Sequence, residues 1–256
     1  MFQRAIIRPP GSNFVGGLTT AGIGLPIYTT VLQQYERYCV ALKQCGLALT
    51  RLEPDPDYPD STFVEDTAVL TARAAVLARP GVPSRMGEAA RMRDVLTQFY
   101  PELQSIHPPG TLDGGDICEA GDHFFIGISE RTNETGAEQL AALLAGAGYT
   151  SNYIDIRGMP GLLHLKSGLA YLGDRRLAVV DALAKREAFC GYDLVSPQVG
   201  EEYAANCLLV NDHLLVAAGY PAFESLMRDL GYNLIVLEMS EFRKMDGGLS
   251  CLSLRF

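Results

Sequence analysis

A repeated pattern is the feature of this sequence that most constrains its fold. Four stretches each read as a strand, a polar turn, a second strand and a loop that leads into a helix; they begin FVEDTAVL, LDGGDICEA, LHLKSGLAYL and YAANCLLV. The strands are rich in Ile, Val, Leu and Phe, and the expected helices carry apolar residues three and four positions apart. The turns between the paired strands contain residues that tight hairpins accept, namely Gly121-Asp122, Gly173-Asp174 and Asn211-Asp212. A unit of this size cannot bury its own hydrophobic face, so the units are expected to pack against one another.

The two ends of the chain together supply a fifth unit. The C-terminal segment DGGLSCLSLRF provides only a first strand, and the N-terminal segment QRAIIRP provides only a second strand, followed by a helix over Tyr28–Cys45. Equivalent positions of the five units fall 40 to 51 residues apart, at Asp66, Asp116, Ser167, Cys207 and Cys251. This spacing predicts an α/β fold of five ββαβ-like units, closed across the termini into a propeller-like array. The alternative is an ordinary α/β sandwich with coincidental hairpins. No linker divides the sequence, so one domain over residues 1–256 is predicted.

Composition and charge exclude several classes of protein. Twenty-one basic residues against thirty acidic ones give a net charge of −9, whereas a nucleic-acid-binding protein needs a basic face. No apolar run approaches the roughly 18 residues of a membrane span. The N-terminus MFQRAIIRPP lacks the apolar core of a signal peptide. A cytoplasmic protein with six reduced cysteines, without a nucleic-acid or membrane partner, is therefore expected.

In a closed array, the residues that lead into each first strand should converge at one end of the central axis. They are Glu65 and Asp66, Asp113 and Asp116, His164 and Lys166, Asn206, and Cys251. Buried charges are costly, so such a cluster should be paired with a cation. For His164 the alternative is a hydrogen-bonded structural histidine. For Cys251, which follows Gly247-Gly248, it is a buried small hydrophobe.

Other residues predict a binding site for a charged small molecule. Arg85 and Arg131 hold matching positions after the second strands of their units, and arginine can bind a carboxylate through two hydrogen bonds. A surface salt bridge is the alternative for each. Asp60 and the Glu65-Asp66 pair offer negative charge to an ammonium or guanidinium group. The glycine-rich segment Gly16–Pro26 is a lid or a long surface loop.

A thiol, an imidazole and carboxylates suit attack on a planar cationic carbon such as that of a guanidinium group. The thiolate would be the nucleophile, and the imidazolium would protonate the departing amine. The same imidazole would then activate water to hydrolyse the covalent thiouronium. A carboxylate such as Asp113 would orient the ring.

The segments PDSTFVED, LDGGDI, HLKSGLAYL and KMDGGLSCLSLRF, in this order and spacing, resemble the dimethylarginine dimethylaminohydrolases of the guanidine-modifying superfamily. The resemblance spans nearly the whole chain. It implies the five-bladed α/β propeller called the pentein fold. It also implies hydrolysis of Nω-methylated arginines to citrulline and methylamine or dimethylamine, without metal or organic cofactor.

The resemblance also implies a role for each matching residue. Cys251 would be the nucleophile, His164 the acid–base, and Asp113 the carboxylate that orients His164, where some relatives have Glu. Glu65 and Asp66 would meet the guanidinium region. Asp60, Arg85 and Arg131 would contact the α-amino and α-carboxylate groups, with backbone contacts from Leu18 and Met245. Asp116 and Asn206 would brace turns.

Three other functions remain open at this point. The first is a deiminase or dihydrolase of the same superfamily that acts on arginine or agmatine. The second is a catalytically silent propeller that serves as a binding protein, against which the intact Cys251 and His164 argue. The third is a metal amidinohydrolase built on Asp60, Glu65 and Asp66, which lacks the expected histidine ligands. A homodimer also remains open.

Overall fold

The computed structural model describes residues 1–256 and contains five three-stranded sheets of one design. In each sheet the middle strand pairs antiparallel with one neighbour and parallel with the other. The first two sheets are β3 (Ala68–Leu70), β4 (Ala75–Leu77), β5 (Gln104–Ser105), and β6 (Ile117–Ala120), β7 (His123–Ile128), β8 (Thr150–Asp155). The next two are β9 (Leu169–Tyr171), β10 (Arg176–Val179), β11 (Asp193–Val195), and β12 (Leu208–Val210), β13 (His213–Ala217), β14 (Leu234–Leu237). The fifth is β15 (Leu254–Arg255), β1 (Arg4–Ile7), β2 (Ala48–Arg51).

The fifth sheet confirms that the two ends of the chain complete one repeat. Strand β1 pairs antiparallel with β15, with Ala5 opposite Arg255 and Ile6 opposite Leu254. The same strand pairs parallel with β2. The predicted α/β class and the five repeated units are therefore confirmed. Closure of the five sheets into one ring stays a prediction.

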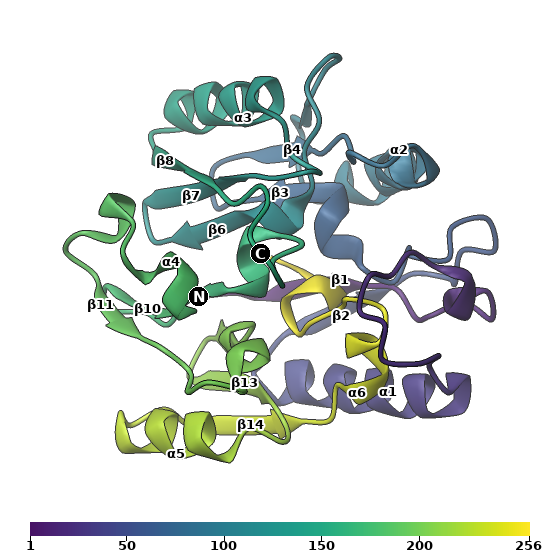
Figure 1. The fold of residues 1–256 in the computed structure, drawn as a ribbon. Coiled ribbons are helices and arrows are strands. Elements are labelled where there is room, and N and C mark those ends of the chain that lie inside the picture. The colour runs from purple at the N-terminus through teal and green to yellow at the C-terminus, as the bar shows by residue number, and fades with distance from the viewer. The chain divides into compact units, whose positions relative to one another are not determined.

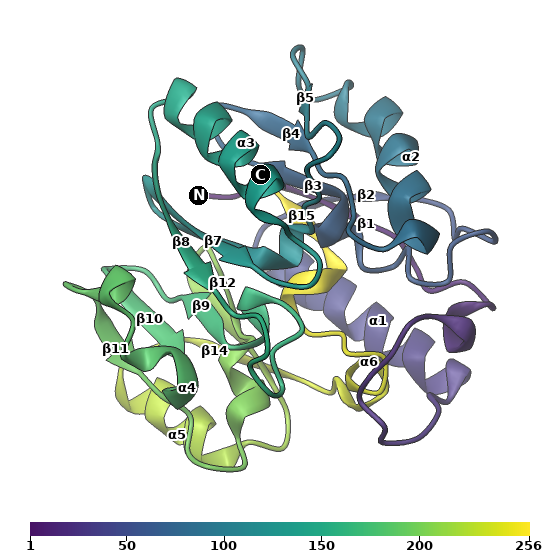
Figure 2. The same ribbon diagram turned by 45° about the horizontal axis from the view of Figure 1, so that its top comes forward.

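A helical crossover joins the second and third strand of every sheet, as parallel pairing requires. The crossovers are α1 (Tyr28–Gln44), α2 (Met86–Leu96), α3 (Glu134–Gly146), α4 (Asp181–Ala184) with a 3-10 turn at Glu187–Phe189, and α5 (Pro221–Asp229). A further short helix, α6 (Ser240–Arg243), follows β14. Figure 2 shows α2 beside the strands β3 and β4. None of the helices is long and apolar enough to cross a membrane.

The predicted hairpin turns have the backbone that their residues favour. Gly121, between β6 and β7, has a φ of 72°, and Asn211, between β12 and β13, has a φ of 52°. Positive φ is easy for glycine and comparatively accessible to asparagine, so both turns are stable in these conformations.

By its internal contacts the chain divides into two compact units. One unit is Glu65–Val195, with three of the sheets, and the other joins Met1–Val64 to Ser196–Phe256, with the remaining two. A single domain over residues 1–256 stays a prediction.

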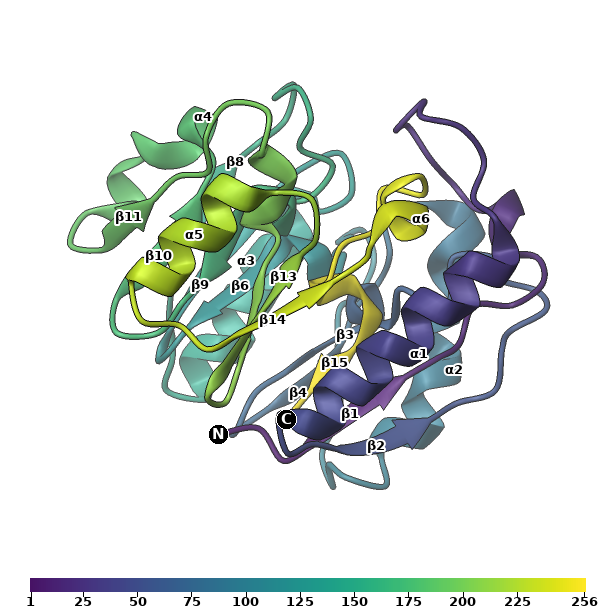
Figure 3. The ribbon, with the colours of Figure 1, turned by 90° about the horizontal axis from the view of Figure 1, so that it is seen from below.

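Each unit buries the apolar faces of its helices against its sheets. In the unit of Glu65–Val195, Leu140 and Leu144 of α3 pack with Phe124 and Ile126 of β7, and Figure 1 shows α3 lying along this sheet. In the other unit, Figure 3 shows α1 running along β1 and β2. Its buried face includes Val31, Tyr35, Tyr38 and Leu42, at the three- and four-residue steps of an amphipathic helix.

Candidate active site

A short 3-10 turn precedes the first strand of every repeat, with at most two residues between them, and we call these segments the lead-in turns. They are Val64–Thr67, Gly114–Asp116, Leu165–Ser167, Glu202–Ala205 and Ser250–Leu252. They carry the residues that the sequence analysis singled out. Glu65, Asp66, Asp116 and Cys251 lie within a turn, while Asp113 and His164 occupy the position just before one. Cys207, one of the five positions predicted to be equivalent, lies two residues beyond its turn, so the equivalence of the positions stays a prediction.

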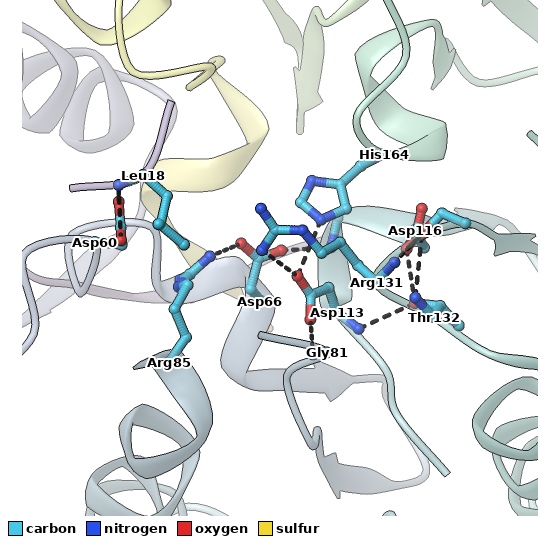
Figure 4. A network of polar contacts seen from close by, with 12 residues as sticks. Leu18, Asp60, Asp66, Gly81, Arg85, Asp113, Asp116, Arg131, Thr132 and His164 are labelled. Atoms are coloured by element: carbon cyan, nitrogen blue, oxygen red, sulfur yellow. Dashed lines mark hydrogen bonds and ion pairs between the residues drawn. The ribbon is translucent and has the colours of Figure 1, made fainter. Parts of the chain in front are cut away.

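His164 and Asp113 form a hydrogen-bonded pair inside the unit of Glu65–Val195. The Nε2 atom of His164 lies 3.1 Å from Oδ2 of Asp113 (Figure 4). The other oxygen of Asp113 accepts the backbone N–H of Gly81 at 2.9 Å. Asp113 is completely buried, and only 8% of His164 is exposed. A carboxylate held in this way fixes both the orientation of the ring and the nitrogen that carries the proton.

Negative charges around His164 stabilise its protonated form. Burial alone would lower the pKa of His164, but the charges of Asp66 and Asp116 and the hydrogen bond with Asp113 outweigh it. Together they raise the pKa of His164 to about 9. The imidazole is therefore protonated at neutral pH and can serve as a proton donor.

Asp66 and Arg85 are paired with each other in the same unit. Nη1 of Arg85 donates to Oδ2 of Asp66 at 2.6 Å, and the guanidinium also makes a two-point contact with Glu88, at 3.0 and 2.8 Å. All three residues are buried. Burial opposes ionisation of Asp66, but the charges of His164 and Arg85 outweigh it and lower its pKa to about 2. The substrate contacts expected of Asp66 and Arg85 stay predictions.

Two further residues predicted to bind substrate also have charged partners here. Glu65 forms an ion pair with Lys166, with 2.6 Å between Oε1 and Nζ. Arg131 places its Nη1 3.9 Å from Oδ2 of Asp113. The structure therefore brings Glu65, Asp66, Arg85, Arg131, Asp113 and His164 into one unit.

Sequence reasoning missed several residues that build this cluster. A Cβ atom on Gly81 would lie 2.2 Å from the carbonyl oxygen of Arg131, and one on Gly115 would lie 2.8 Å from the His164 ring. Only glycine allows these close approaches. Glu88 was also missed, although an acid three residues after Arg85 at a helix start is a recognisable pairing signal. Thr132 gives no such signal, yet its hydroxyl accepts the backbone N–H of Asp113 at 3.1 Å.

Cys251 belongs to the other unit and is partly exposed. It lies in the middle of its lead-in turn and donates its backbone N–H to Gly248 at 3.3 Å. The turn before it is tightly packed, because a Cβ on Gly247 would lie 2.4 Å from the Phe63 ring. All six cysteines are free thiols in this structure, and Cys190 is the other one that is not buried. That they are reduced in the cell stays a prediction.

The predicted lid is fastened near its start by side chains of its own unit. The carboxylate of Asp60 accepts the backbone N–H of Leu18 at 3.1 and 3.2 Å. Asp246 accepts the N–H of Thr20 at 2.5 Å, and Met245 beside it is buried. In Figure 4 the Asp60 carboxylate points at the Leu18 nitrogen.

Asp66, Asp113 and His164 also offer possible metal ligands. One ligand atom from each lies within 4.8 Å of the others. Each side chain already has a hydrogen-bond partner within the protein. The absence of a metal therefore stays the prediction.

The chain resembles known proteins over its whole length. No protein-family model matches it. It is 41% identical over 257 residues to the N(G),N(G)-dimethylarginine dimethylaminohydrolase of Pseudomonas aeruginosa, and the match covers all of both chains. The chain belongs to the dimethylarginine dimethylaminohydrolase family. It is accordingly a hydrolase.

Solved structures agree with this family assignment. A cysteine-to-serine variant of the Pseudomonas aeruginosa dimethylarginine dimethylaminohydrolase, complexed with citrulline, has a TM-score of 0.97 at 40% identity and full coverage of both chains. The N-terminal domain of a cyanobacterial arginine dihydrolase has a TM-score of 0.87 over 98% of this chain and 97% of that one. At 17% identity this second likeness shows the fold alone. The pentein fold expected from the family resemblance is confirmed.

Proposed function

We propose that this chain hydrolyses Nω-methylated arginines to citrulline and dimethylamine or methylamine, through a covalent intermediate on Cys251. The observation that carries the proposal is the His164–Asp113 pair, in which a buried carboxylate holds an imidazole whose pKa is about 9. A protonated, oriented imidazole suits a reaction whose leaving group is an amine, because the amine must be protonated as it departs. Full-length similarity to a dimethylarginine dimethylaminohydrolase supports the same chemistry.

In the first half of the reaction, the Cys251 thiolate attacks the guanidinium carbon and forms a C–S bond. The product is a neutral tetrahedral adduct. His164 then donates its proton to the methylated nitrogen, the C–N bond breaks, and the amine leaves. A cationic thiouronium remains on Cys251.

In the second half, the now neutral His164 takes a proton from a water molecule that attacks the thiouronium carbon. The C–S bond breaks, which returns the thiolate and releases citrulline. Hydrolysis liberates two protons, of which one restores the His164 imidazolium and the other leaves to solvent. Protein side chains supply every step, so no cofactor is required in this proposal.

The substrate roles of the remaining residues belong to the same proposal. Glu65 and Asp66 would hold the guanidinium group. Asp60, Leu18 and Met245 would contact the amino-acid end.

The two arginines are unequal candidates for the substrate carboxylate. Arg85 is buried between the acids Asp66 and Glu88, so its charge is already compensated. Arg131 has an ion-pair distance of 3.9 Å to Asp113 and retains some exposure. We therefore assign the larger share of carboxylate binding to Arg131.

An assay on purified, chelator-treated protein tests the proposal. Dimethylarginine, arginine and agmatine are each offered, and the ureido product and the released amine are identified by mass spectrometry. We expect citrulline with dimethylamine from dimethylarginine. Ammonia released from arginine or agmatine in preference would replace the proposal with a deiminase or dihydrolase, and no turnover of any of the three would favour a binding protein.

We also propose a cellular setting and a partner class. The net charge of −9 supports a cytoplasmic enzyme that acts on a cationic small molecule and has no nucleic-acid partner. Size-exclusion chromatography with light scattering would decide between a monomer and a homodimer.

A further inference from the structure

Three repeats share one contact between successive lead-in turns. In each, a side-chain oxygen at one turn accepts a backbone N–H from the next turn along the chain. Oδ1 of Asp66 accepts the N–H of Gly115 at 2.8 Å, and Oδ1 of Asp116 accepts that of Leu165 at 2.9 Å. Oδ1 of Asn206 accepts the N–H of Ser250 at 3.2 Å. The partners are 49, 49 and 44 residues apart, so the contact follows the repeat.

Two of the three contacts end beside a proposed catalytic residue. Leu165 directly follows His164, and Ser250 directly precedes Cys251. The contact from Asp116 is part of a larger network. Its other oxygen accepts the hydroxyl groups of Ser129 at 2.7 Å and Thr132 at 2.6 Å.

Asn206 makes the corresponding contact with its amide oxygen and adds a second contact with its amide nitrogen. While Oδ1 accepts the Ser250 N–H, Nδ2 donates to Oγ of Ser250 at 3.2 Å. The amide also lies directly on the glycine turn, since a Cβ on Gly248 would come 2.4 Å from Oδ1 of Asn206. Asn206 and Ser250 are both buried.

The lead-in turn that precedes Asn206 supplies a third hydrogen bond. The hydroxyl of Tyr203 donates to the carbonyl oxygen of Gly247 at 2.7 Å. Two hydrogen bonds to backbone atoms and one to the Ser250 side chain therefore hold the segment Gly247–Ser250, which directly precedes Cys251. A buried amide that loses its partners costs stability, so this arrangement is rigid.

We infer that Asn206 is a positioning residue for Cys251: it fixes the turn that carries the thiol and so sets the direction of nucleophilic attack. The inference rests on the proposed function for the role of Cys251. A nucleophile displaced by about 1 Å from its attack position can lose roughly a hundredfold in rate. Asp116, at the matching position of its own repeat, holds the segment that carries His164. The repeated contact therefore aligns both proposed catalytic residues, His164 and Cys251.

The test compares Asn206→Leu with Gln34→Leu, both in a Cys190→Ala background. Gln34 is a matched control, because this buried amide also accepts a backbone N–H, from Glu241 at 3.1 Å, and donates to a serine hydroxyl, Ser240 at 2.8 Å. Thermal unfolding measures the structural loss in each variant. The alkylation rate of Cys251 by iodoacetamide, followed by peptide mass spectrometry over a pH series, reports the thiol without requiring turnover. Steady-state kinetics completes the set.

We expect both variants to lose stability to a similar degree. Only Asn206→Leu should change the alkylation profile of Cys251 and lower kcat, by roughly ten- to a hundredfold, with KM changed less than about threefold. An Asn206→Leu protein whose alkylation profile and kcat match those of Gln34→Leu would overturn the inference. If Asn206→Leu does not fold, Asn206→Ala, which also removes both amide contacts with Ser250, serves in its place, with Gln34→Ala as its control and the same criterion.

Failure of the inference and failure of the proposed function are distinguishable. If the parent protein turns over none of the three substrates, the proposed function is wrong. The alkylation comparison would still show whether Asn206 controls the Cys251 thiol.

Discussion

The two compact units hold their proposed catalytic residues by different physical means. In Glu65–Val195, His164 lies among buried charges that compensate one another, including Asp66, Arg85 and Asp113. In the other unit, Cys251 is partly exposed, and neutral hydrogen bonds with close-packed glycines fix the turn before it.

The difference follows from what each residue is proposed to do. A residue that stores and transfers a proton needs a surrounding field that sets its pKa, and such a field is strong only where water is excluded. A nucleophile must be reached by substrate and held in a fixed direction, and Cys251 is partly exposed and follows a hydrogen-bonded turn. Variants in the two units should therefore fail in different ways.

The largest effect is expected for Cys251→Ser. A serine hydroxyl in this position is a far weaker nucleophile than a thiolate, so turnover should fall by roughly ten-thousandfold or more. Ligand binding, measured by calorimetry with citrulline or dimethylarginine, should survive. The other thiol that is not buried provides the control, because Cys190→Ser should keep full activity. Substantial activity in Cys251→Ser would rule out the covalent route.

The second largest effect is expected for Asp113→Asn, in the unit of Glu65–Val195. An asparagine has no charge and only one acceptor oxygen, so it cannot accept from both the Gly81 N–H and His164 as the carboxylate does. The His164 imidazolium is then less favoured, and kcat should fall by roughly a hundred- to ten-thousandfold. Activity requires protonated His164, so in the parent protein it should decline as pH rises through about 9. In the variant this decline should move to lower pH. The control is Asp122→Asn, an exposed acid paired with Arg73, which should leave the pH–rate profile unchanged. An unshifted profile in Asp113→Asn would contradict the assigned pairing.

The negative charges around His164 also predict that the stability of the folded protein depends on pH. The pKa of His164 is raised in the folded protein, so its contribution is fully present below an unfolded pKa of about 6.5. It is lost as pH rises through about 9. The full contribution is on the order of 3 kcal/mol. Denaturant unfolding of the parent protein and of His164→Gln, at pH 6 and at pH 10, isolates it. The parent should lose more unfolding free energy than the variant between these two values. An equal loss in both proteins would show that folding does not raise the pKa of His164.

Much of this architecture was predictable because repetition makes equivalent positions comparable. Hairpin turns such as Asn211-Asp212 and the lead-in residues from Asp66 to Cys251 could be aligned without any structure. The partners of those residues could not be predicted in the same way. Gly81, Glu88 and Thr132 contact the predicted residues through backbone geometry or from outside the repeat position. Whether a glycine is required for a close approach, as at Gly115 against the His164 ring, depends on coordinates and not on residue type.

The smallest effect is expected at the start of the lid. Asp246 accepts the backbone N–H and the hydroxyl of Thr20, at 2.5 and 3.1 Å. Its φ of 57° is a conformation that asparagine also tolerates, so Asp246→Asn removes the charge without backbone strain. A neutral acceptor makes a weaker hydrogen bond than a carboxylate, which should leave residues Gly16–Pro26 fastened less often. We expect KM for dimethylarginine to rise about threefold while kcat stays within about twofold, since the lid is proposed to contact substrate and not to take part in bond breaking.

The matched control for the lid variant is Asp212→Asn, an exposed acid in the hairpin turn between β12 and β13. Limited proteolysis gives a second measurement, because a lid released from Asp246 should be cleaved faster between residues 16 and 26 while the Asp212 variant is cleaved like the parent. A large loss of kcat in Asp246→Asn, with KM unchanged, would mean that this residue acts on the Cys251 turn that it precedes. Asp246 would then belong with Tyr203 and Asn206 among the residues that hold the turn before Cys251, and not among those that fasten the lid.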